Sequence, residues 1–228
     1  MPKNPTRTSR WTGAAYLGIV LCGLFAEFFV RGSLTVPGDA RATAEAIAAS
    51  PGFFRLGIGA DMLMVGLDVG VAFGLYRILR PIDPRLATAA TVARLLQAGV
   101  LAVNLLQLTK ALSFAQLSTS APTYAAAALQ ALESHARMYD VALIPFGIAC
   151  LILGRLFWLA TAPRALAIGL SMTGVVYLAG SFVKLLTFST ALDPFYAISI
   201  VVEPAVAIWL MVHKGRMETA RETFAAAR

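Results

Sequence analysis

Six separate apolar stretches, each long enough to cross a bilayer as a helix, constrain this chain more than any other feature of its sequence. They cover residues 11–30, 56–79, 86–112, 136–159, 165–188 and 195–213. Hydrophobic residues make up 58% of the chain and charged residues 14%, whereas soluble domains are about half apolar and about a quarter charged. The sequence therefore predicts an all-α integral membrane protein, built as a bundle of six transmembrane helices.

The placement of lysine and arginine predicts how this bundle is oriented. Twelve of these residues lie in the two tails and in the connections that follow the second and fourth stretches, whereas three lie in the loops on the other side. Because positively charged loops stay in the cytoplasm, we expect cytoplasmic tails at residues 1–10 and 214–228 around one transmembrane domain, 11–213. The net charge of +7 is explained by this excess, so the expected partner is the lipid bilayer and not nucleic acid.

Two of the loops predicted to be external are long and contain signals for short helices. Residues 31–55 hold a Pro37-Gly38 turn and then good helix formers over 39–50, while residues 113–133 hold Ser120 as a candidate N-cap before a helix over 124–132. The C-terminal tail carries apolar residues at helical spacing over 217–228, which predicts a short helix at the membrane surface.

Ionisable residues inside the apolar stretches are the strongest functional signal, because charge at membrane depth is costly. Asp61 and Asp68 share one helical face, and Arg94, Gln97 and Asn104 form a similar stripe on the next stretch. One-sided stripes predict a polar bundle interior, here concentrated in the outer half and the middle of the membrane. The nine residues are Glu27, Asp61, Asp68, Arg94, Lys110, Arg137, Asp140, Lys184 and Glu203.

Depth also predicts a specific ion pair. Arg94 lies near the bilayer centre and cannot reach either surface, while Asp68 and Glu203 lie at a similar depth. We therefore expect Arg94 to bridge to Asp68 or to Glu203 and to form the floor of an outward-facing polar cavity.

Motifs for a particular chemistry are weak. His135 and His213 fall at opposite membrane faces, and no metal-binding or phosphate-binding motif is present, so we expect no metal and can name no cofactor. Ser181 and Lys184 match the S-x-x-K pattern of some nucleophilic enzymes, but only two of its four positions are fixed. Cys22 and Cys150 are interpreted as buried free thiols.

Several segments resemble a bacterial family of uncharacterised six-span membrane proteins, catalogued as domain of unknown function 4386. The likeness rests on residues 23–39 with Glu27, Arg31 and Pro37-Gly38, on 55–61 with Asp68, on 94–97 with Asn104, and on 135–140. It implies the six-span fold, bacterial origin and the cytoplasmic membrane, but no activity. It also implies that its matched charged residues act as one unit: Glu27, Arg31, Asp61, Asp68, Arg94, His135 and Asp140.

The charged residues and the long outer loops are consistent with two functions of different classes, and an enzyme comes third. The first is binding or transport of a small polar or amphipathic ligand, which includes a lipid from the outer leaflet. The second is an accessory subunit whose charges pair internally and whose outer loops hold a membrane protein or a second copy. The third is an intramembrane enzyme that uses Asp140 or Lys184. The predicted cavity residues are Glu27, Arg31, Asp61, Asp68, Arg94, Asn104, His135, Asp140, Lys184 and Glu203.

Overall fold

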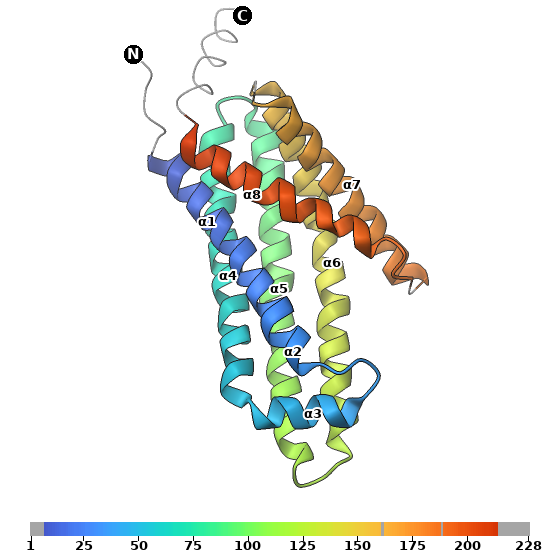
Figure 1. The fold of residues 1–228 in the computed structure, drawn as a ribbon. Helices are drawn as coiled ribbons and strands as arrows, with labels where there is room; N and C mark the ends of the chain where they lie inside the picture. Colours follow the sequence, from blue (N-terminus) through green and yellow to red (C-terminus); the bar gives the residue numbers. More distant parts are fainter. Residues whose placement is uncertain (1–6, 161, 188, 214–228) are drawn as a thin grey trace, which may run out of the picture.

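The computed structural model describes residues 7–160, 162–187 and 189–213, and these form long helices joined by short turns (Figure 1). The predicted surface helix at 217–228 lies outside the described residues, as do 1–6 of the N-terminal tail. Six helical segments are long and apolar enough to cross a membrane, which confirms the predicted six-helix class. The elements are α1 (Arg7–Leu24), the π-helix η1 (Phe25–Arg31), α2 (Gly32–Leu34), α3 (Ala40–Ala49), α4 (Pro51–Leu79), α5 (Pro84–Ser118), α6 (Tyr124–Leu159), α7 (Arg164–Thr187), the 3-10 turn η2 (Asp193–Tyr196) and α8 (Ala197–Val212).

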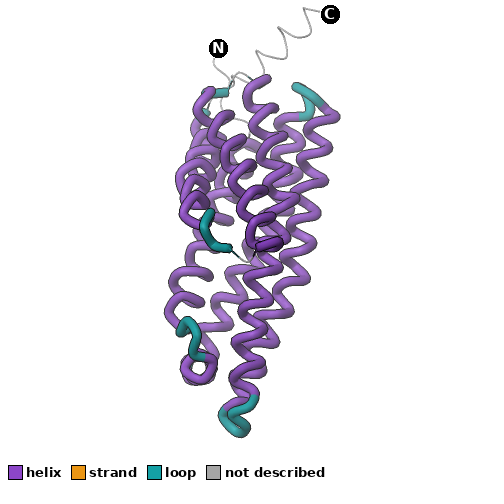
Figure 2. The backbone as a smooth tube through the Cα atoms, turned by 90° about the vertical axis from the view of Figure 1, so that its right-hand side faces the viewer, coloured by secondary structure: helices purple, strands orange, loops and turns teal. Residues whose placement is uncertain are grey.

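The bundle has two unlike ends. At the first, here called the terminal end, α1 begins, α8 ends, and short turns join α4 to α5 and α6 to α7 (Figure 1). The second, the distal end, carries α3 and the turn between α5 and α6. Helices α7 and α8 accompany only the half next to the terminal end, so the distal half is narrower (Figures 1 and 2).

Large apolar side chains form the core of the terminal half. Leu153, Leu156 and Leu170 are fully or almost fully buried there, between α6, α7 and their neighbours. Large apolar residues such as Leu96 on α5 and Val201 on α8 are exposed on the outside of the bundle, with exposed fractions of 60% and 71%. An apolar exterior around a packed interior is the arrangement expected of helices that face lipid.

A second core, rich in alanine, fills the distal half. Ile47 of α3, Leu108 of α5 and Ala128 of α6 are all completely buried in it. Asp39 is the N-cap of α3, and its carboxylate accepts a hydrogen bond from the Ala42 backbone N–H at 2.9 Å. The helix predicted over 39–50 is thereby confirmed.

The distal ends of α5 and α6 extend well beyond the predicted spans. Their 35 and 36 residues correspond to about 52 and 54 Å, against about 30 Å of hydrocarbon in a bilayer. The predicted external segment 113–133 is therefore helical except in a turn around 119–123, and the helix predicted over 124–132 is the start of α6. The predicted cap at Ser120 is wrong, because the residue before α6 is Thr123, which makes no side-chain cap.

Two basic residues that we expected at membrane depth lie within one turn of this extension. Lys110 is exposed on α5, and Arg137 is exposed on α6, where its guanidinium lies 3.7 Å from Glu133. Neither side chain joins the buried charged groups. The two cysteines are free, as interpreted from the sequence, with Cys150 buried and Cys22 partly buried.

Candidate functional site

Charged groups from two helical segments, the π-helix η1 and α4, meet in the distal half. Arg31 donates from Nε to Glu27 Oε2 at 2.8 Å and from Nη1 to Asp61 Oδ2 at 2.5 Å. The wide turn of η1 contains both Glu27 and Arg31, and such turns occur often at functional sites. The exposed fractions of the side chains are 62% for Glu27, 11% for Arg31 and 3% for Asp61. Glu27 is therefore the accessible end of this triad.

His135 and Asn104 complete what we call the distal cluster: Glu27, Arg31, Asp61, Asn104 and His135. Asn104 donates from Nδ2 to the backbone carbonyl of His135 at 3.0 Å, which ties α5 to α6. The His135 side chain is buried and interacts electrostatically with Arg31 and Glu27. Among the described residues, His135 Nδ1 and Asn104 Oδ1 have no hydrogen-bond partner. The cluster thus retains unused donor or acceptor capacity next to its ion pairs.

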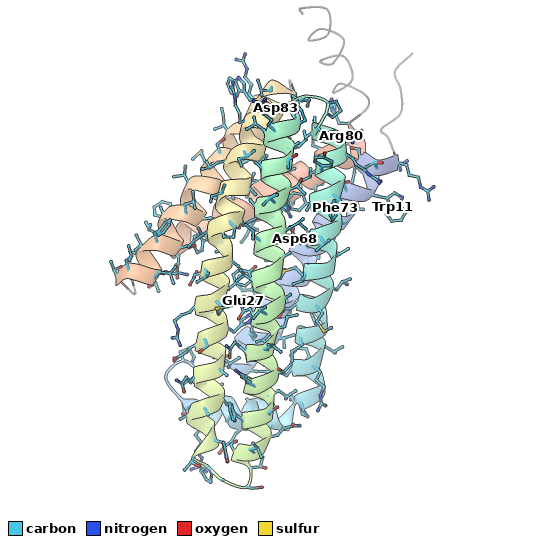
Figure 3. The ribbon with its side chains drawn as sticks, turned by 180° about the vertical axis from the view of Figure 1, so that it is seen from behind. Trp11, Glu27, Asp68, Phe73, Arg80 and Asp83 are labelled. Carbon is cyan, nitrogen blue, oxygen red and sulfur yellow. The ribbon has the colours of Figure 1, made fainter. Side chains whose placement is uncertain are left out.

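A second group of polar side chains, the central cluster, lies closer to the terminal end. It consists of Tyr16, Asp68, Arg94, Tyr177 and Glu203. Arg94 forms a buried ion pair with Asp68, as the sequence predicted. Its guanidinium lies 5.1 Å from the ring centre of Tyr16 and 5.0 Å from that of Phe146. Figure 3 shows the two levels, with Asp68 nearer to Arg80 and Asp83 of the terminal end than Glu27 is.

Glu203 occupies the same centre without a basic partner of its own. Its carboxylate accepts a hydrogen bond from the Tyr177 hydroxyl at 3.0 Å. It is buried and interacts electrostatically with Arg94, but in the described part of the chain no basic nitrogen lies within 4.0 Å of it. The alternative pairing of Arg94 with Glu203 is therefore not the one observed.

The lateral cluster lies where α6, α7 and η2 meet. Lys184 Nζ lies 3.2 Å from Asp140 Oδ1 and 2.9 Å from Asp193 Oδ1, and 4.9 Å from the ring centre of Tyr196. The two carboxylates thus share one ammonium group as their ion-pair partner. Ser181, one turn before Lys184 and part of the S-x-x-K pattern, is fully buried.

Tyrosines connect the three clusters. The ring of Tyr139 lies 6.3 Å from that of His135 in the distal cluster, and Tyr139 packs against the core group that contains Tyr177 of the central cluster. The rings of Tyr177 and Tyr196 lie 5.5 Å apart and join the central cluster to the lateral one. On the terminal side of Arg94, the gap between Leu75, Leu79 and Leu153 has no space for a water molecule.

The ten predicted cavity residues therefore fall into three connected clusters. Sequence reasoning missed Asp193, which lies outside the predicted spans, Tyr16 beside Arg94, and Tyr139 between two of the clusters. The signal for Asp193 was present in Asp193-Pro194, a helix-start dipeptide just before the last apolar stretch. The tyrosines gave no distinct signal, because an aromatic residue on an apolar helix is usually packed in a core.

Three comparisons with known proteins were made. The model of one family, described as "Domain of unknown function (DUF4386)", matches residues 11–213. No curated protein and no solved structure matches the chain.

Proposed function

The chain belongs to the family of the domain of unknown function DUF4386, and on this premise we propose that it binds or transports a small polar or amphipathic ligand. We assign the ligand to the distal cluster and the protein to the bacterial cytoplasmic membrane. The observation that carries the proposal is the accessible carboxylate of Glu27, which Arg31 links to the buried carboxylate of Asp61.

The chemistry of the distal cluster supports a ligand with separate polar and apolar parts. Glu27 offers an accessible carboxylate, and His135 Nδ1 lacks a partner among the described residues. Phe28 and Phe29, next to Glu27, have exposed fractions of 63% and 66%. A ligand could therefore hydrogen-bond to the cluster while its apolar part contacts these rings.

The direction of access follows from the same charge count that we used for the topology. Twelve lysine and arginine residues lie in the tails and connections of the terminal side and three in the predicted loops of the distal side. The exposed Lys110 and Arg137 raise the distal number to five, and from this asymmetry we propose that the terminal end is cytoplasmic. The distal cluster would then face the periplasm or the outer leaflet. The full burial of Arg94 supports access from that side alone.

The test is native mass spectrometry of the full chain purified in a mild detergent. We expect a co-purified small molecule at one copy per chain, and we expect Glu27→Gln to lower its occupancy at least several-fold. Glu45→Gln is the matched control, because Glu45 also pairs with an arginine four residues away and has the same exposed fraction, 62%.

Two results would contradict this proposal. One is a wild-type protein that carries only detergent and bulk lipid. The other is an equal loss of the small molecule in Glu27→Gln and Glu45→Gln, since the ligand would then not depend on the distal cluster.

One observation favours a second candidate, an accessory membrane subunit. Each basic side chain of the three clusters, Arg31, Arg94 and Lys184, already has a carboxylate partner inside the chain. Buried ion pairs of this kind can be purely structural. A stoichiometric protein partner in the same spectra, in place of a small molecule, would support this candidate.

A further inference from the structure

A groove of about 500 Å³ runs between α6 and α7 on the outside of the terminal half. This volume lies within the range of about 300–1,000 Å³ that is usual for ligand sites. Its walls are mainly apolar and are formed by Leu151, Trp158, Ile168, Met172, Val175 and Val176. The groove is separate from the three charged clusters, because none of their residues lines it.

Small residues create this groove. A Cβ atom placed on Gly154 would lie 2.2 Å from Ser171 Oγ and 2.8 Å from the carbonyl oxygen of Ala167. The two helices therefore approach at backbone distance here, and no large side chain fills the surface above the contact. Ile168, Met172 and Val175 remain about half exposed along the wall.

Positive charge is concentrated at the end of the groove nearest the turn between α6 and α7. Arg155 lines the groove, and the guanidinium of Arg164 lies 5.2 Å from the ring centre of Trp158. Both arginines are exposed, and no carboxylate of the described residues lies within 4.0 Å of either. Tryptophan is typical of the membrane–water interface, so the guanidinium groups lie at headgroup depth.

We propose that this groove binds an acidic phospholipid, with an acyl chain along Ile168, Met172 and Val175 and the phosphate at Arg155 and Arg164. An apolar channel that ends in basic groups between two transmembrane helices matches both parts of such a lipid. A second copy of the chain is a poorer occupant, because a two-fold contact would place this arginine pair against its own copy. The site is distinct from the distal cluster and does not depend on its ligand.

The test titrates the full chain in detergent with dioleoyl phosphatidylglycerol or dioleoyl phosphatidylcholine. Native mass spectrometry gives the lipid-bound fraction, and the shift of the melting temperature gives an independent reading of the same binding. We expect phosphatidylglycerol to bind with the higher affinity. The double variant Arg155→Gln with Arg164→Gln should weaken that binding about 25-fold, because each arginine near an anionic headgroup is worth about five-fold in affinity.

Matched control variants distinguish binding in the groove from the effects of positive charge and of added side-chain volume elsewhere on the protein. Arg77→Gln with Arg85→Gln removes two positive charges from the adjoining ends of α4 and α5, at the same end of the bundle, and it should leave the preference for phosphatidylglycerol unchanged. Val175→Trp fills the groove and should lower binding of both lipids. Val201→Trp adds the same ring to an exposed position on α8 and should lower neither.

Four results would overturn the proposal. The first is equal affinity for the two lipids, which would indicate ordinary annular contact. The second is an equal effect of the two double-arginine variants. The third is binding that Val175→Trp leaves intact, since the groove would then hold no lipid. A wild-type dimer that Val175→Trp dissociates would also overturn it, since the groove would then hold a second chain.

Discussion

Arg94 is a charged side chain that is stable inside the bilayer only because neighbouring groups compensate its charge. Its exposed fraction is 1%, and it pairs with Asp68 while it lies between the rings of Tyr16 and Phe146. An unpaired guanidinium at this depth would carry the cost of losing its hydration. Asp68 and the two rings therefore determine whether Arg94 is tolerated.

Arg94→Ala should lower the melting temperature markedly, because it leaves the Asp68 carboxylate buried without a partner. Breaking such a pair costs about 3–5 kcal/mol. Thermal unfolding of the single variants and of Arg94→Ala with Asp68→Ala, measured in one detergent, forms a double-mutant cycle. The double variant should recover part of the loss, and strictly additive losses would show that the pair contributes no coupling energy.

Glu203 and Asp68 allow a comparison of two buried carboxylates with different partners. Glu203→Gln removes a charge that has no ion pair among the described residues and leaves an amide oxygen that can still accept from Tyr177. Its melting temperature should be unchanged or raised. Asp68→Asn should lower it, because Arg94 then loses its counter-charge. A loss in Glu203→Gln as large as that in Asp68→Asn would contradict this assignment.

The sequence limited the partner of Arg94 to Asp68 or Glu203, because all three residues lie at similar depth. The contact of Lys184 with Asp193 was not predictable, since Asp193 lies in a turn outside every predicted span. The choice of Asp68 over Glu203 also could not be made from the sequence. It depends on how closely α4 and α8 approach α5, which charge and spacing do not determine.

At the scale of elements, α6 and α7 pack through a pair of glycines. A Cβ atom on Gly174 would lie 2.7 Å from the carbonyl oxygen of Gly147, and one on Gly147 would lie 3.0 Å from the carbonyl oxygen of Gly174. Small residues at helix contacts allow such close backbone approach within membranes. This contact holds Asp140 of α6 within reach of Lys184 of α7.

Gly174→Ala should therefore destabilise the protein by about 1–3 kcal/mol, since the added methyl group overlaps backbone. Gly70→Ala on α4 is the control, because nothing lies within 4 Å of a Cβ atom there. It should be neutral or up to about 1 kcal/mol stabilising. Urea unfolding in mixed micelles would compare the two variants, and equal stabilities would mean that α6 and α7 can separate without cost.

The sequence indicated six helices correctly but ended the span in α5 too early, at 112, and began the span in α6 too late, at 136. The region 111–131 contains many alanines and few large apolar residues, so it reads as a loop beside a membrane span. Alanine is nevertheless the strongest helix former. Here Ala111, Ala115 and Ala128 are fully buried in the distal core, and that packing continues both helices to Ser118 and from Tyr124.

At the scale of the whole molecule, orientation is the property that most affects the proposed function. Ser120 lies in the exposed turn between α5 and α6 at the distal end. In a chain whose Cys22 and Cys150 are replaced by alanine, Ser120→Cys should react with a membrane-impermeant maleimide added outside intact cells. Strong labelling only from the cytoplasmic side would reverse the topology and would remove the outward access that we propose.

The partners of the basic side chains also bear on how the chain enters the membrane during synthesis. Arg31 has Glu27 four residues before it, Arg94 has Asp68 in the preceding helix, and Lys184 has Asp193 just after its own helix. A translocon that releases helices in order, or as consecutive pairs, can therefore release each positive charge together with a negative one. The cost of inserting a lone charge, about 2.5–3.5 kcal/mol at the helix centre, would thus be reduced at each step, before the complete bundle exists.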